Sequence, residues 1–143
     1  MKKHLSLLLF LSCLSVFSQT DELVGDYFRR SGSEEDHLIE YKLTVSPDGT
    51  FSFHSYTNHK KGIPWIRNNY GKGTWKADGK IISFFTDTAK DLDEKHTLNF
   101  SHSKARFITK PPRDKTDRVI KTRLQFFESE IFWIERLEIY KTP

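Results

Sequence analysis

The sequence predicts an all-β fold, and three features of the chain indicate it. From His37 to Val45 apolar and polar residues alternate, which is the period of a strand with one buried face. Two turn signals, Pro47-Asp48-Gly49 and Asp78-Gly79, separate strand-like segments. No segment keeps a helical period over three turns. We therefore expect antiparallel strands joined by short turns.

The first five expected strands follow from this pattern. Leu23–Arg29 opens with a glycine and two aromatic residues, and His37–Val45 forms a hairpin with Thr50–Phe53 across the first turn signal. Tyr70–Lys76 precedes the second turn signal, and Lys80–Thr86 follows it with apolar residues on both faces. The local turn chemistry makes these two hairpins the basis of the predicted sheet.

Three further strands are expected in the second half of the chain. His96–Ile108 alternates less strictly, and the pair Pro111-Pro112 then starts a long loop because proline lacks a backbone donor. Val119–Phe127 and Ile131–Tyr140 complete a set of eight. The last segment also contains good helix formers, but its β-branched and aromatic residues favour a strand.

The N-terminus has the layout of a secretory signal peptide. Two lysines precede an apolar run at residues 5–17, which is too short to span a membrane. Small or tolerated residues at the −3 and −1 positions predict cleavage after Ser18. We expect residues 1–18 to be removed and residues 19–143 to form one soluble domain, in the periplasm or outside a bacterial cell.

Cleavage would change the chemistry of the chain in two ways. It removes Cys13, the only cysteine, so the mature domain has neither a thiol nor a disulfide. It also lowers the formal net charge from +4 to +2, which is too small to indicate nucleic acid as a partner. Lipid modification of Cys13 is disfavoured, because Phe10 stands where a lipoprotein site has leucine and Leu14 continues the apolar run.

Four short motifs resemble those of the small bacterial secreted lipocalin-like (calycin-type) domains. They are Leu23-Val24-Gly25-Asp26-Tyr27, Asp48-Gly49-Thr50-Phe51, Gly73-Thr74-Trp75 and Tyr140-Lys141. The resemblance implies an up-and-down eight-stranded barrel, which closes on itself and removes sheet edges. Tyr27 stands where larger lipocalins have tryptophan, and the Cys-x-x-Cys of the copper-linked periplasmic branch is absent, so no ligand residue is carried over.

The all-β meander, the aromatic content and the apolar loop around Trp65 favour a binding protein, with a small apolar or amphipathic molecule as ligand. The candidate ligand-binding residues are Tyr41, Phe53, Trp65, Trp75 and Phe84. The same aromatic content can instead fill the barrel, leaving the outer surface to meet a protein, a glycan or an anionic cell surface. The apolar loop Lys60–Tyr70 has two interpretations, a lid or contact surface and a plug over the barrel end.

Basic residues cluster in two segments, 58–72 and 104–123. If both lie at one end of the barrel, they form a positive rim that attracts anionic ligands or polymers. The rim candidates are Lys60, Lys61, Arg113, Lys115 and Arg118. The alternative is an ordinary solvated surface, balanced by acidic segments elsewhere such as 34–36 and 91–94.

Neither a metal site, a cofactor nor an enzyme is expected. The histidines left after cleavage are His37, His54, His59, His96 and His102. His96 and His102 share a strand face but stand about 20 Å apart, and His54 and His59 flank a segment that can turn. Zinc needs three or four converging ligands. The chain also lacks a Gly-x-Ser-x-Gly elbow and a phosphate-binding glycine loop. The oligomeric state stays open.

Overall fold

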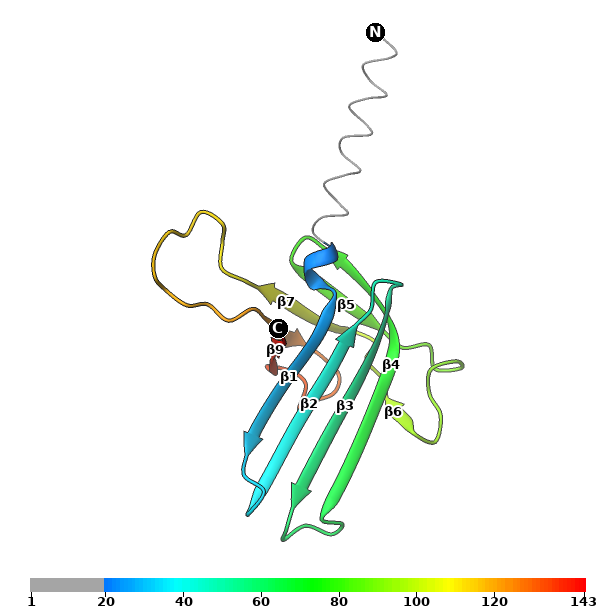
Figure 1. Cartoon of the computed structure of the whole chain (residues 1–143). Coiled ribbons are helices and arrows are strands. Elements are labelled where there is room, and N and C mark those ends of the chain that lie inside the picture. Colours follow the sequence, from blue (N-terminus) through cyan, green and yellow to red (C-terminus); the bar gives the residue numbers. More distant parts are fainter. Residues whose placement is uncertain (1–19) are drawn as a thin grey trace.

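The computed structural model describes residues 20–143, which form a closed barrel of eight antiparallel strands with a ninth strand beside it (Figure 1). The strands are β1 (Gly25–Gly32), β2 (His37–Val45), β3 (Thr50–His59), β4 (Ile66–Asp78), β5 (Ile81–Phe85), β6 (His96–Leu98), β7 (Ser103–Ile108), β8 (Arg123–Glu128) and β9 (Glu138–Lys141). Around the barrel the order is β1-β2-β3-β4-β5-β7-β8-β9, and β9 returns to β1. The predicted all-β antiparallel barrel is confirmed, whereas the expected leader lies outside the described residues.

The first four strands form a long meander with tight turns. β2 pairs with β3 along its whole length, from His37 opposite His59 to Val45 opposite Phe51. At the connecting turn Gly49 adopts a φ of 87°, which glycine reaches without steric cost. The Asp48 carboxylate accepts hydrogen bonds from the nitrogen and the Oγ1 of the residue after the turn glycine, at 3.0 and 2.7 Å. The predicted hairpin is therefore built as its turn chemistry indicated.

Only part of this meander belongs to the closed wall of the barrel. β5 pairs with residues 74–78 of β4, and β9 pairs with β1 only at Tyr27 and Phe28. β6 runs parallel to the middle of β4, opposite Tyr70 and Gly71. The rest of β1–β4 continues beyond the closed part as an overhanging sheet, at the bottom of Figure 1. We call this the lower end of the barrel, and the opposite end, which carries turn 46–49, the upper end.

Aromatic and aliphatic side chains fill the closed part of the barrel. The rings of Phe51 and Phe84 meet edge-on with centroids 5.0 Å apart, and Phe84 stacks on Phe126 at 5.4 Å. An eight-stranded barrel is just wide enough to be filled by such side chains. Of the two alternatives left open by the sequence, the filled interior therefore describes this part of the barrel.

Phe100 reaches the centre of this core because β4 carries a glycine opposite it. A Cβ atom at Gly71 would lie 2.6 Å from the Phe100 ring, so any larger residue would push the ring away. The Phe100 backbone nitrogen donates to Thr86 Oγ1 at 2.9 Å. The prediction of one strand over His96–Ile108 is therefore wrong. The chain turns inward at residues 99–102 to bury this ring, and it separates β6 from β7.

The prediction of a strand over Ile131–Tyr140 is wrong for most of that segment. Residues 131–136 form turns, and only the last residues enter β9. Ile131, Ile134 and Leu137, spaced three residues apart, pack against the core, and Ile134 is fully buried. A spacing of three suits a coiled turn rather than a flat strand. Residues 129–137, which we call the plug segment, therefore close the core from below.

The β3–β4 hairpin is longer than expected. The loop that the sequence placed at Lys60–Tyr70 shrinks to residues 60–65, because β4 already begins at Ile66. Ile63 is 99% exposed and Trp65 is 63% exposed. This loop therefore does not plug the barrel, and its apolar side chains face solvent. β8 likewise begins later than expected, at Arg123.

Residues 20–23 form a helical turn that covers the upper end of the barrel. Leu23 is buried, and its carbonyl oxygen accepts a hydrogen bond of 2.7 Å from the hydroxyl of Tyr27. Burial raises the pKa of the Tyr27 hydroxyl. Within residues 20–143, no helix combines the length and apolarity that crossing a bilayer requires.

The core position of Phe100 predicts a large stability difference between two phenylalanines. Phe100→Ala should lower the free energy of unfolding by about 3–5 kcal/mol, because it removes a fully buried ring. Phe132→Ala, at a ring that is 85% exposed, should change it by less than about 0.5 kcal/mol. Urea denaturation of the two variants measures both values, and equal losses would contradict the packing.

Candidate functional site

A cleft opens at the lower end of the barrel, on the inner face of the overhanging sheet. Its volume is about 470 Å³. The lining residues come from β2, β3, β4 and the plug segment, and they are His37, Ile39, Tyr41, Ser55, Thr57, Arg67, Asn69, Phe132 and Trp133. We call it the mouth cleft. Its volume lies within the range of small-molecule sites in proteins, about 300–1,000 Å³.

The floor of the mouth cleft is aromatic. Trp133 stacks on Tyr41 with ring centroids 6.0 Å apart, and it also lies 6.1 Å from the ring of Phe53. Phe53 is buried and in turn contacts Phe100, with centroids 5.0 Å apart. The floor is thus the lower surface of the barrel core, and its position is fixed by close packing.

Polar side chains of β3 and β4 form the wall of the cleft. Ser55 lies opposite Asn69, and Thr57 lies opposite Arg67 in the antiparallel ladder. The lining residues include one guanidinium and no carboxylate. The wall therefore offers hydroxyl, amide and cationic groups to a bound molecule, and it has no acidic group to repel an anion.

Tyr41 connects the aromatic floor with the polar wall. Burial raises the pKa of its hydroxyl, and the positive charge of Arg29, its neighbour across β1 and β2, opposes part of that rise. The Arg29 Nη1 donates to the carbonyl oxygen of Glu138 at 3.0 Å, which holds this charge beside the cleft. At neutral pH the Tyr41 hydroxyl is protonated and can donate a hydrogen bond.

The histidines of the described chain are spread over several places in the fold. His37 of β2 and His59 of β3 pack at the lower end with ring centroids 4.5 Å apart. His54 stacks on Tyr70 at 4.4 Å, and His96 contacts the carboxylate of Asp93. His54 and His59 both belong to β3, so the turn expected between them is absent from this strand. Among residues 20–143 no three His, Cys, Asp or Glu side chains gather as a metal site.

The structure separates the five predicted ligand-binding residues. Tyr41 lines the mouth cleft, and Phe53 lies directly beneath it. Trp75 and Phe84 are buried in the closed part of the barrel, where the Trp75 Nε1 donates to a turn carbonyl at 2.9 Å. Trp65 lies in the β3–β4 loop, outside the cleft lining. Of the five, Tyr41 therefore borders the cleft, and Phe53 supports its floor.

The two basic segments lie at opposite ends of the barrel. Lys60 and Lys61 are in the lower β3–β4 loop, whereas Arg113, Lys115 and Arg118 are in the loop between β7 and β8. That loop starts at the upper end, because the backbone nitrogen of Phe107 in β7 donates to the carbonyl oxygen of Lys80, which follows the β4–β5 turn, at 2.7 Å. The condition for one shared positive rim is therefore not met. Arg118 is also paired with Asp114 at 2.6 Å.

The sequence pattern missed most of the polar wall. Ser55 and Thr57 share the inner face of β3 with Phe51 and Phe53, because alternate residues of a strand point to the same side. Extending the predicted strand beyond Phe53 would have identified both residues. Trp133 was placed in a strand, and its position on the cleft floor follows from the fold of the plug segment. A contact between residues so far apart in the sequence leaves no pattern among neighbouring residues from which it could be predicted.

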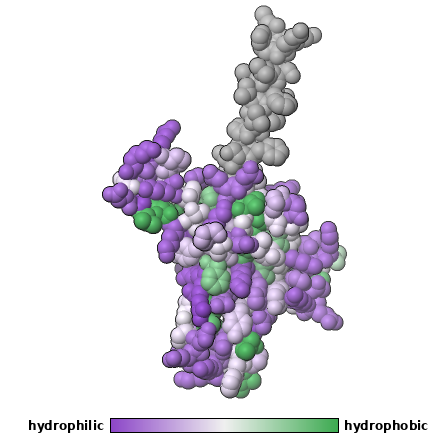
Figure 2. Space-filling model, viewed as in Figure 1, coloured by the Kyte–Doolittle hydropathy of each residue, from purple (hydrophilic) through white to green (hydrophobic). Residues whose placement is uncertain are grey.

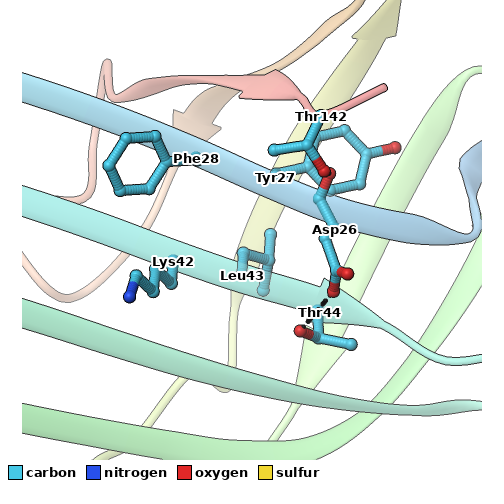
Figure 3. Close-up of a pocket in the computed structure, with 7 residues that line it drawn as sticks. All are labelled: Asp26, Tyr27, Phe28, Lys42, Leu43, Thr44 and Thr142. Atoms are coloured by element: carbon cyan, nitrogen blue, oxygen red, sulfur yellow. Dashed lines mark hydrogen bonds between the residues drawn. The ribbon is translucent and has the colours of Figure 1, made fainter.

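A second hollow lies on the outer face of β1 and β2 (Figure 3). Its volume is about 310 Å³, and Phe28 and Lys42 stand side by side across the two strands. The Asp26 carboxylate, which lines this hollow, accepts a hydrogen bond of 2.7 Å from Thr44 Oγ1. This polar group therefore already has a hydrogen-bond partner within the protein. The mouth cleft is larger and has a continuous aromatic floor, which makes it the better candidate site.

No protein-family model, curated protein or solved structure matches this chain. The closed antiparallel barrel is the architecture that the resemblance to lipocalin-like domains implied. Function must therefore be inferred from the chemistry of the mouth cleft.

The raised pKa of Tyr41 predicts a pH effect on stability. Below pH 10.0, the ordinary value of its pKa, the folded and unfolded chains both keep the proton. Above it the unfolded chain loses the proton first, so the free energy of unfolding falls as the pH rises. Tyr41→Phe should make this alkaline fall shallower, as measured by urea denaturation between pH 9 and 11. Tyr56→Phe is the matched control, and an identical change in both variants would contradict the assignment.

Proposed function

We propose that this protein is a secreted lipocalin-like binding protein that holds a small amphipathic molecule in the mouth cleft. One observation carries the proposal: a cleft of about 470 Å³ has an aromatic floor and a polar wall at the end of a filled barrel. Binding sites for small molecules combine an apolar lining with a few directed polar groups in this way. The ligand is held at the mouth and does not enter the barrel interior.

The charge of the lining favours an acidic head group. Arg67 supplies the formal positive charge of the cleft, and Asn69 beside it supplies an amide donor. A guanidinium binds a carboxylate or sulfonate more strongly than a neutral group, because the hydrogen bonds are charge-assisted. The apolar part of the ligand would lie on Trp133 and Tyr41, where a flat ring can stack.

A matched set of three probes tests the site and its preference. Isothermal titration calorimetry with 2-naphthoate, 2-naphthylmethanol and 2-naphthylmethylamine compares an acid, an alcohol and an amine on the same ring. We expect the acid to bind best and the amine to bind worst. Arg67→Gln should weaken naphthoate binding by about tenfold, the loss of one charged hydrogen bond, and leave naphthylmethanol unchanged.

Arg113→Gln is the matched control, because Arg113 is an exposed arginine in the upper loop. It should bind all three probes as the parent protein does. Trp133→Ala should weaken all three, because they share the ring that stacks on the cleft floor. The proposal fails if none of the probes binds, or if Arg113→Gln and Arg67→Gln have the same effect.

A second candidate function is favoured by the filled interior and by the loop between β7 and β8. This loop projects from the barrel in Figure 1 and carries the exposed Arg113 and Lys115. A solid barrel of this kind would contact an anionic protein, glycan or cell surface through the loop. The loop has internal contacts, since Lys110 Nζ donates to the Thr116 carbonyl at 2.5 Å.

Retention on immobilised heparin tests this second candidate. Replacing Arg113, Lys115 and Arg118 together by glutamine should lower the salt concentration at which the protein elutes, because fewer cations then contact the polyanion. Replacing Lys60 and Lys61 instead probes the cations of the opposite end. Unchanged elution of the triple variant would refute a role for the upper loop.

A further inference from the structure

The β3–β4 hairpin ends in a set of apolar side chains that no part of the described chain covers. Ile63 is 99% exposed, Trp65 63% and Ile66 52%. We call residues 63–66 the apolar tip. Figure 2 shows hydrophobic colouring at the lower end of the molecule, surrounded by hydrophilic residues. Soluble proteins seldom expose such neighbouring large side chains unless the surface meets a partner.

Cationic residues flank the apolar tip on both sides. Lys60 and Lys61 precede it, Arg67 follows it, and residues 58–68 contain no acid. None of these three cations forms an ion pair with another described residue. Their charges are therefore available to an anionic partner.

The nearest acidic residues lie in the β1–β2 turn. The two turns are adjacent, since the Lys60 backbone nitrogen donates to the Asp36 carbonyl at 3.3 Å. Glu34 is engaged by Arg30 at 3.1 Å, and Glu40 lies 3.7 Å from the same guanidinium. Glu35 and Asp36 of the same turn take part in neither of these ion pairs, so the positive charge at the apolar tip comes from its own flanking residues, 58–68, and not from the neighbouring turn.

This combination of side chains fits the interface of a bilayer. Isoleucine side chains partition into the boundary of the acyl chains, tryptophan prefers the level of the head groups, and lysines extend toward lipid phosphates. A second copy of this chain would bring the same cations together, and like charges would oppose that contact. A projecting hairpin with flanking cations complements a surface that is apolar inside and anionic outside.

We propose that the apolar tip docks this protein on bilayers that contain anionic phospholipids. The docked orientation places the lower end of the barrel, and with it the mouth cleft, against the membrane. Phe132, which lines the cleft and is 85% exposed, also lies at this end. The docking proposal does not rest on a ligand in the mouth cleft, because Ile63, Trp65 and Ile66 lie outside the cleft lining.

Co-sedimentation with vesicles tests the proposal on the chain from residue 19 onward. The vesicles are phosphatidylcholine, with or without phosphatidylglycerol. The parent protein should sediment with the mixed vesicles and less with pure phosphatidylcholine. Ile63→Ser combined with Trp65→Ser should reduce the bound fraction at least about tenfold, because the inserted apolar area is lost. Lys60→Gln with Lys61→Gln should lower binding to the mixed vesicles by a similar factor.

Val119→Ser is the matched control, since Val119 is 86% exposed in the loop at the other end of the barrel. It should bind vesicles as the parent protein does. The fluorescence of Trp65 should shift to shorter wavelength on docking, because it is the most exposed tryptophan. Circular dichroism confirms that each variant is folded, as expected for changes at exposed positions.

Three outcomes would overturn the proposal. The parent protein could fail to sediment with either vesicle, or Val119→Ser could lose as much binding as the change at the apolar tip. In the third, sedimentation velocity without vesicles would reveal a dimer that Ile63→Ser dissociates, which would assign the apolar tip to contact between copies. Failure of naphthoate to bind would leave the docking result unaffected, so the two proposals are judged separately.

Discussion

The insertion of Phe100 against Gly71 is the contact on which the rest of the structure depends. It places a fully buried ring among the phenylalanines of β3 and β5, and it needs the bare backbone of β4 to do so. Because this ring fills the middle of the barrel, a bound molecule has no room there. The mouth cleft lies below it, between the overhanging sheet and the plug segment.

In the overhanging sheet, β3 and β4 carry two different surfaces. Inward side chains of β3 and β4 form the wall of the mouth cleft, whereas the turn that joins them carries the apolar tip. At the start of β4, strand alternation turns Arg67 toward the cleft, whereas its neighbour Ile66 is exposed at the apolar tip. Arg67 contributes to both surfaces, as it lines the cleft and flanks the apolar tip. A change at this residue therefore affects two properties at once.

Local patterns predicted the meander, and tertiary packing decided the rest. The alternation of His37–Val45 and the turn at Gly49 depend on neighbours in the sequence, so both could be recognised. The breaks near Phe100 and Ile134 arise because each side chain fills a space made by distant strands. In the mouth cleft Tyr41 was predicted, whereas Ser55 lay beyond the strand that the sequence indicated and Trp133 depended on the plug segment.

From the unequal pairing of the strands we expect an order of assembly. β2 and β3 are neighbours in the chain and pair along their whole length, whereas β1 meets β9 at two positions only. That junction joins distant residues, since Thr142 bonds the Asp26 carbonyl from 116 positions away. Closing so long a loop is entropically costly, so the junction is expected to form late. The strands that carry the cleft wall and the apolar tip would then be in place before the barrel closes.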